Sequence, residues 1–107
     1  MKRLDSQDLA DLAVGAAFLG TGGGGDPYIG RILVQRCLDE GLSVDLLDPE
    51  DLADDAFVIP TAMMGAPTVL VEKLPSGDEA ILSLRRLEKR LGRTATATMP
   101  IEIGGIN

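Results

Sequence analysis

Four consecutive glycines, Gly22 to Gly25, are the feature that most constrains how this chain can fold. Glycine loses more backbone entropy on folding than any other residue, so such a run is typical of backbone that turns at positive φ or approaches another group closely. Asp26 is a favourable N-cap and Pro27 a favourable first helical residue, which predicts a helix directly after the glycines. The free N–H groups at the start of that helix would attract an anion. The alternative is a close-packed crossing between two helices.

Four helical segments, including the one after the glycines, are predicted from caps and apolar spacing. Asp5 or Ser6 can cap a helix over 8–19, although the apolar stretch 12–19 could also be a buried strand. Glycine or proline signals delimit the others, at 27–40, 48–52 and 79–91. The side chains expected to face inward are Leu9, Leu12, Ala13, Ala16 and Leu19, then Ile29, Ile32, Leu33 and Cys37 or Leu38, and finally Ala80, Ile81, Leu84, Leu87, Glu88 and Leu91.

Short apolar or β-branched runs between these helices predict strands. They lie at 43–47, 56–60, 94–98 and 100–103. Residues 68–74 could be extended or helical, and their β-branched composition favours an extended segment. Because helices and strands alternate, we expect one α/β domain over residues 1–107, a three-layer sandwich with a mainly parallel sheet and helices on both faces.

Two carboxylates and one further loop complete the candidate site. In an open α/β sheet ligands bind at the carboxyl ends of the strands, which is where residues 61–67 are expected and where Glu102 precedes Gly104 and Gly105. Asp26 and Glu102 together could bind a hydrated metal ion or share acid/base catalysis, but Glu102 could also be a solvated strand residue and the methionines could simply fill the core. The proposed catalytic residues are Glu102 and Asp26, and the proposed ligand-binding residues are Thr21, Gly22, Gly23, Gly24, Gly25, Met64 and Gly65.

A nucleotide is a second possible ligand of the glycine run. Gly20, Gly22 and Gly25 satisfy the dinucleotide pattern G-x-G-x-x-G, and Asp45 or Asp48 lies near the offset of the ribose-binding acid. That interpretation requires a strand, not a helix, over 12–19. A nucleoside-triphosphate loop is excluded because no Lys-Ser or Lys-Thr follows the glycines.

Composition narrows the class of partner. A formal net charge of −7 without a basic stripe argues against nucleic acid. The chain has no histidine, which removes the commonest general base and zinc ligand, and its single cysteine, Cys37, can form no internal disulfide. It also shows no signal core and no apolar run long enough to span a membrane, so a cytoplasmic location is expected.

Three stretches resemble one known family. They are residues 19–28, residues 65–69 with Glu72 and Lys73, and the closing Ile-Glu-Ile-Gly-Gly-Ile-Asn of 101–107, and together they are similar to the DUF917 family, also called the S-methyl thiohydantoin desulfurase family. The resemblance implies a three-layer α/β N-terminal domain followed by a β-rich second domain. It favours a helix over 8–19 and implies that the chain corresponds to the first third of a family member.

These observations together predict the N-terminal portion of an enzyme that hydrolyses a thiohydantoin- or hydantoin-type small molecule, with part of its active site in this chain. A non-catalytic ligand-binding or assembly module and a nucleotide-binding domain are the alternatives. Neither a cofactor nor a metal is specified by the sequence. We expect the chain to associate with itself or with a C-terminal portion, because it has few aromatic residues with which to complete a core.

Overall fold

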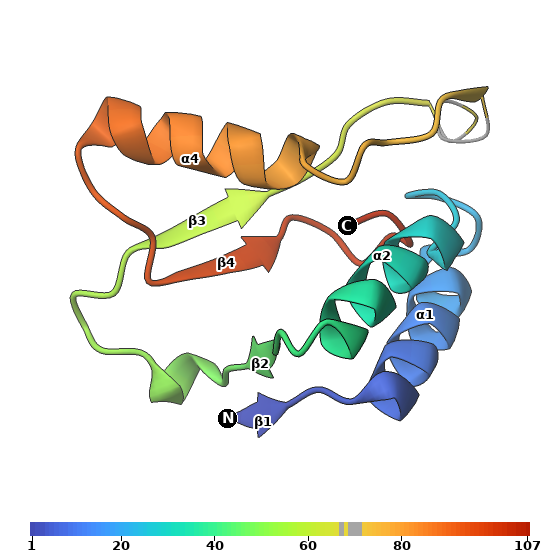
Figure 1. Ribbon diagram of the computed structural model, residues 1–107, viewed down its shortest axis with the longest axis horizontal. Coiled ribbons are helices and arrows are strands. Elements are labelled where there is room, and N and C mark those ends of the chain that lie inside the picture. The colour runs from blue at the N-terminus through green and yellow to red at the C-terminus, as the bar shows by residue number, and fades with distance from the viewer. Residues whose placement is uncertain (67, 69–71) are drawn as a thin grey trace.

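The computed structural model describes residues 1–66, 68 and 72–107 of the chain. Two helices form an antiparallel hairpin on one side of the molecule, and on the other a third helix lies along one strand of a parallel pair (Figure 1). In chain order the elements are β1 (Lys2–Arg3), α1 (Ser6–Gly20), α2 (Tyr28–Asp39), β2 (Asp45–Leu46), the 3₁₀ turn η1 (Pro49–Asp51), β3 (Val58–Thr61), α4 (Glu79–Leu91) and β4 (Ala97–Pro100).

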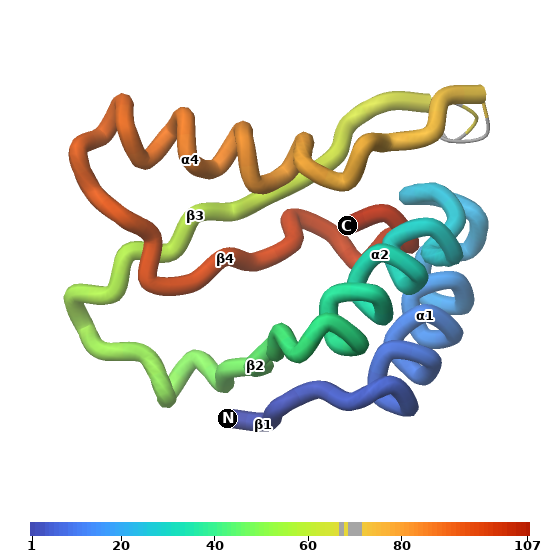
Figure 2. The backbone as a smooth tube through the Cα atoms, viewed as in Figure 1, coloured from blue at the N-terminus to red at the C-terminus, as the bar shows by residue number. Residues whose placement is uncertain are grey.

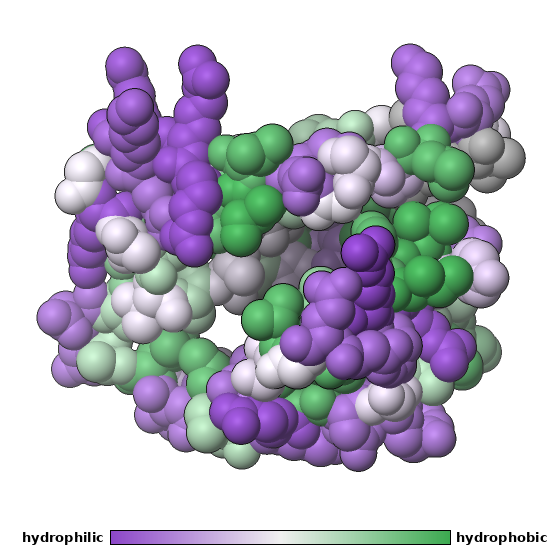
Figure 3. Space-filling view, viewed as in Figure 1, coloured by the Kyte–Doolittle hydropathy of each residue, from purple (hydrophilic) through white to green (hydrophobic). Residues whose placement is uncertain are grey.

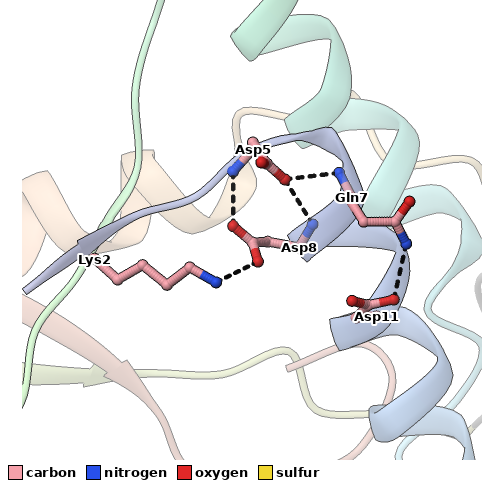
Figure 4. A network of polar contacts seen from close by, with 5 residues as sticks. All are labelled: Lys2, Asp5, Gln7, Asp8 and Asp11. Carbon is pink, nitrogen blue, oxygen red and sulfur yellow. Dashed lines mark hydrogen bonds and ion pairs between the residues drawn. The ribbon is translucent and has the colours of Figure 1, made fainter.

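Helix α1 confirms the helix predicted over 8–19 and begins at a reciprocal cap. The carboxylate of Asp5 accepts hydrogen bonds from the backbone N–H groups of Gln7 and Asp8, each at 2.9 Å, and the carboxylate of Asp8 accepts from the N–H of Asp5 at 3.1 Å (Figure 4). Three N–H groups that the helix leaves without internal partners are thereby satisfied. The helix ends where Thr21 adopts a left-handed conformation with φ 50°.

The other helical predictions are confirmed with small shifts at their ends. The N-cap of α2 is Pro27, one residue later than predicted, and the Oδ1 of Asp26 before it accepts the backbone N–H of Tyr28 at 2.9 Å. Gly41 follows α2 at φ 87°, and Gly92 ends α4 at φ 67°, both in the region that glycine adopts without strain.

The strands differ from the prediction. Within the described ranges they form two separate pairs and no single parallel sheet: β1 pairs antiparallel with β2, and β3 pairs in parallel with β4 in the register Val58 to Ala97. The strand predicted at 43–47 is reduced to Asp45–Leu46, and its partner β1 was not predicted. The strand predicted at 100–103 is also wrong, because β4 ends at Pro100 and residues 101–105 are bends.

The extended conformation predicted at 68–74 is wrong where the structure describes this stretch, because Glu72 is helical and its backbone N–H donates to the carbonyl oxygen of Thr68 at 3.1 Å. Residues 69–71 lie outside the described residues. Pro67, which belongs to the loop predicted after the second strand, also lies outside them.

The apolar core is thin. Among the hydrophobic residues that the structure describes, Leu9 and Ile59 are the buried ones, with 7% and 4% of their surface exposed. Several side chains predicted to face inward are exposed instead, namely Leu12, Leu19, Ile32, Ile81, Leu87 and Leu91. Of the two strands in this sheet, α4 packs against β3, so much of the apolar face of α4 is left uncovered.

One buried charge fastens α4 to the segment before β4. Glu88 is only 7% exposed, and its carboxylate accepts hydrogen bonds from the Arg85 guanidinium and from the backbone N–H of Ala95, both at 2.7 Å. The Arg85 guanidinium, with a smaller effect from the Ala95 N–H, holds the pKa of Glu88 below its usual range. The sequence placed Glu88 on the inward face of this helix, and the structure confirms that position.

Candidate functional site

The glycine loop after α1 packs directly against the second glycine turn near the end of the chain. Figure 2 shows the C-terminal segment, in red, returning to the end of the α1–α2 hairpin where the loop lies. A Cβ atom added to Gly24 would lie 2.3 Å from the Cα of Gly104, and one added to Gly104 would lie 2.5 Å from the Cα of Gly24. The backbone N–H of Ile106 donates to the carbonyl oxygen of Gly24 at 2.9 Å. The two loops are therefore in backbone-to-backbone contact.

A second pair of glycines makes the same kind of contact. A Cβ on Gly25 would lie 2.2 Å from the Cδ1 of Ile106, and a Cβ on Gly105 would lie 2.3 Å from the carbonyl oxygen of Gly25. Real side-chain carbons do not approach other atoms so closely, so glycine is required at both positions. The predicted packing alternative paired two helices, whereas the structure pairs two loops.

The carboxylate of Glu102 lies where these loops meet. Its Oε1 accepts a hydrogen bond from the Nδ2 of Asn107 at 2.7 Å, and the Oδ1 of Asn107 in turn accepts the backbone N–H of Met63 at 2.8 Å. Asn107 thus joins the turn after β4 to the segment after β3. Since β3 and β4 are parallel neighbours, both segments leave the sheet at the same edge, as the sequence predicted for this pair.

A cavity of about 330 Å³ opens beside Glu102. Its lining combines glycine backbone, the methionine-containing segment after β3, two isoleucines and two polar side chains: Gly24, Gly25, Met63, Met64, Gly65, Ala66, Ile101, Glu102, Ile106 and Asn107. Most of this surface is apolar, and one carboxylate and one amide supply its side-chain polarity. A small, largely apolar cavity with a few fixed polar groups is the usual form of a small-molecule site.

The structure brings together part of the candidate site that the sequence proposed. Five of its members line the cavity, namely Gly24, Gly25, Met64, Gly65 and Glu102. Thr21, Gly22, Gly23 and Asp26 are not among the lining residues, and the carboxylate of Asp26 accepts the backbone N–H of Tyr28 at the start of α2.

Asn107 is the polar lining residue that sequence reasoning did not propose. Its partners Met63 and Glu102 are 44 and 5 positions away, so no local pattern announces the contact to Met63. The signal in the sequence is an asparagine that follows a Gly-Gly turn close to a glutamate.

A metal ion and a dinucleotide are the other ligands that the sequence suggested for this region. In residues 1–66, 68 and 72–107 no group of three or more His, Cys, Asp or Glu side chains is placed to hold a metal ion. Residues 12–19 belong to helix α1, so the glycines that match the dinucleotide pattern join a helix to a helix, whereas that pattern requires a preceding strand. No helix among the described residues is long and apolar enough to cross a membrane.

The fold and the cavity define a small mixed α/β domain in which two glycine loops and a glutamate enclose a ligand-sized space. The chain belongs to the S-methyl thiohydantoin desulfurase-like family, because the family model described as "S-Me-THD-like, N-terminal domain" matches residues 7–107. This match confirms the resemblance drawn from the three sequence stretches. A comparison with curated proteins found no match, and a comparison with solved structures found none either.

Proposed function

We propose that this chain is the N-terminal portion of an enzyme that hydrolyses an S-methyl thiohydantoin or a related hydantoin-type ring in the cavity beside Glu102. The observation that carries the proposal is the Glu102 carboxylate, held at 2.7 Å by Asn107 on the wall of a cavity of about 330 Å³. Membership of the S-methyl thiohydantoin desulfurase-like family supports this substrate class.

The cavity suits a small planar ring. Its volume of about 330 Å³ is at the lower end of ligand cavities, which span roughly 300–1,000 Å³. Met63, Met64, Ile101 and Ile106 offer apolar and polarizable contacts to a methylthio group. The polar edge of the ring would meet Glu102 and the glycine backbone.

Glu102 supplies the general base in this proposal. Water adds to the ring carbon that carries the methylthio group, and Glu102 accepts a proton from that water. The carbon–sulfur bond then breaks, the proton passes from Glu102 to the departing sulfur, and methanethiol leaves. The hydroxyl left on the ring carbon gives its proton to the adjacent ring nitrogen and becomes a carbonyl, so the products are hydantoin and methanethiol.

Turnover of an S-methyl thiohydantoin, followed as thiol release with a chromogenic disulfide, tests the proposal. Replacing Glu102 with glutamine removes the base at nearly constant volume, so we expect Glu102→Gln to lower kcat by about 10²-fold or more. Glu50→Gln, which removes an exposed carboxylate from η1, is the matched control and should retain full turnover. Equal thiol release by Glu102→Gln and wild type would contradict the role of Glu102, and no thiol from wild type would contradict the substrate.

An assembly or binding module without catalysis is the second candidate, and one observation favours it. Gly24, Gly25, Gly104 and Gly105 all have packing partners that exclude a side chain, so packing alone accounts for these glycines. Thermal shift measurements with an S-methyl thiohydantoin, NAD and AMP distinguish the candidates. Stabilisation by the thiohydantoin without turnover would favour a binding module, and stabilisation by NAD or AMP would favour a nucleotide site.

A further inference from the structure

Asn107 uses both ends of its side-chain amide. The Oδ1 atom accepts from the backbone N–H of Met63 at 2.8 Å, and the Nδ2 atom donates to Oε1 of Glu102 at 2.7 Å. A backbone N–H can only donate and an ionised carboxylate can only accept, so the two partners fix which end of the amide faces which group. Neither aspartate nor a shorter residue can satisfy both partners at once.

Oε1 of Glu102 also lies close to the contact between Gly24 and Gly104. A Cβ on Gly104 would lie 3.1 Å from Oε1 of Glu102, and a Cβ on Gly24 would lie 3.3 Å from it. The oxygen therefore occupies the space that the two missing side chains leave open. Three segments converge on Glu102: the first glycine loop, the turn after β4 and, through Asn107, the segment after β3.

We infer that Asn107 is a positioning residue that fixes the carboxylate of Glu102 in the cavity and couples it to the segment after β3. The inference rests on the proposed function for its catalytic consequence. Its structural content, that one amide holds both Glu102 and Met63, stands independently of any reaction. Asn107 touches no reacting atom in this account and acts through Glu102.

Two substitutions of Asn107 distinguish its hydrogen bond to Met63 from its hydrogen bond to Glu102. Asn107→Asp keeps an acceptor for the Met63 N–H but replaces the donor to Glu102 with a second carboxylate oxygen. Asn107→Ala removes both contacts. The structural measurement is amide hydrogen exchange at Met63 by NMR on this chain: we expect Asn107→Ala to accelerate exchange by about tenfold, the value of one net hydrogen bond, and Asn107→Asp to leave it within about twofold of wild type.

The contact to Glu102 has its own spectroscopic signal. Asn107 is the single asparagine of the chain, so its side-chain amide protons give one identifiable pair of resonances. Glu102→Ala should shift that pair upfield by removing its acceptor. The side-chain amides of Gln7 and Gln35, which bind Asp11 and Asp39, should not move and serve as internal controls.

Kinetics supply the readout that a purely structural role would not change. With an S-methyl thiohydantoin as substrate, Asn107→Asp should lower kcat by about 10²-fold, as Glu102→Gln does, while KM stays within about twofold because the cavity keeps its shape. The inference would be overturned, whatever the activity, if Asn107→Ala left amide exchange at Met63 unchanged and Glu102→Ala left the Asn107 side-chain resonances unchanged. Normal kcat in Asn107→Asp would overturn it as well. Absence of turnover by wild type would defeat the proposed function, and the NMR measurements alone would then decide whether Asn107 holds Glu102.

Discussion

Gly22 and Gly24 share a left-handed backbone but not their surroundings. Their φ angles are 85° and 75°. A Cβ at Gly22 would meet no atom within 4 Å, whereas one at Gly24 would lie 2.3 Å from the Cα of Gly104. The two positions therefore separate the cost of the backbone conformation from the cost of a blocked contact.

We expect Gly22→Ala to lower the free energy of unfolding by about 1–2 kcal/mol, because the added Cβ disfavours the left-handed conformation. Gly24→Ala should cost a further ~1–3 kcal/mol, because its Cβ must also push the two loops apart. Urea denaturation of wild type and both variants measures the difference. Equal destabilisation would show that the loops do not touch as closely as described.

This geometry changes how a larger substitution at Gly24 has to be interpreted. From the sequence alone, Gly24→Val is expected to lose function out of proportion to stability, because the glycines would leave room for a ligand. In the structure the space beside Gly24 is occupied by Gly104 and by Oε1 of Glu102. Gly24→Val should therefore reduce the stability and the function of the protein together. Glu102→Gln and Asn107→Asp are the sharper tests of function.

At the scale of elements, the hairpin of α1 and α2 depends on an unbroken α1. Leu12 lies inside this helix, so Leu12→Pro removes a helical hydrogen bond and sets the proline ring against the preceding turn. We expect a loss of ~3 kcal/mol or more, enough to unfold a small domain, measured as loss of the helical circular dichroism signal.

Ser6→Pro is the matched control for Leu12→Pro. Ser6 is the first residue of α1, where proline is tolerated, and Asp5 before it is already extended with φ −112° and ψ −178°. The control loses only the exposed hydrogen bond from Gln35 to the Ser6 hydroxyl. A folded Leu12→Pro variant would contradict the helix.

Glu88 makes the attachment of α4 sensitive to acid. Its folded-state pKa is lowered from the usual 4.5, first by Arg85 and then by the Ala95 N–H, so the ionised form favours the folded state. That stabilisation is fully present above pH 4.5 and is lost as the pH falls through the lower folded-state value. Glu88→Gln should therefore be less stable than wild type at neutral pH and lose less stability on acidification.

Urea denaturation at pH 7, 5 and 3 tests the acid sensitivity. The carboxylates of Asp8, Asp45 and Asp51 also have lowered pKa values, through Lys2, Arg3 and the N-terminal amine respectively, and they contribute equally in both proteins. Glu50→Gln, on the exposed surface of η1, serves as control. Parallel stability curves for Glu88→Gln and wild type would rule out this role.

The helices could be predicted from the sequence because their signals are local. The Asp5 cap, the Asp26–Pro27 pair before α2 and the glycine at Gly92 all lie within a few residues of the helix ends they determine. Strand pairing has no comparable local signal. The strand β1 comprises only Lys2 and Arg3, with no apolar alternation, and it exists because Asp45 and Leu46 lie beside it. The same limit explains why Glu102 could be proposed from its sequence neighbours and why the Asn107–Met63 contact could not.

At the scale of the whole molecule, large apolar side chains are abundant on the surface. Phe18 is 78% exposed at the end of α1, with Val14 and Leu19 exposed nearby. Further apolar side chains are exposed on α4 (Ile81, Leu82, Leu87 and Leu91), and Figure 3 shows hydrophobic surface at several places on one face of the molecule. Exposed apolar surface of this extent is typical of proteins that bind other protein surfaces.

We expect the chain to associate in solution through this apolar surface. Light scattering at increasing protein concentration should show a rising mean mass, and Phe18→Lys should reduce that mass. The variant should remain as stable as wild type, because the side chain at position 18 is already exposed and a cation is favourable near the C-terminal end of a helix. Ser83→Lys, which adds the same charge to α4, is the control. A monodisperse monomer at high concentration would contradict the expectation.

The contact between Gly24 and Gly104 also bears on the order in which the molecule folds. It joins positions near opposite ends of the chain, so its formation must wait until the long intervening loop has closed, at a cost in chain entropy that the helices do not bear. We therefore expect the cavity to assemble after α1, α2 and α4 and to open before they do. Native-state hydrogen exchange should then release the Ile106 N–H, which is bonded to the Gly24 carbonyl, at a lower free energy than the helical amides. The proposed active site would be the last part of the domain to form and the first to come apart.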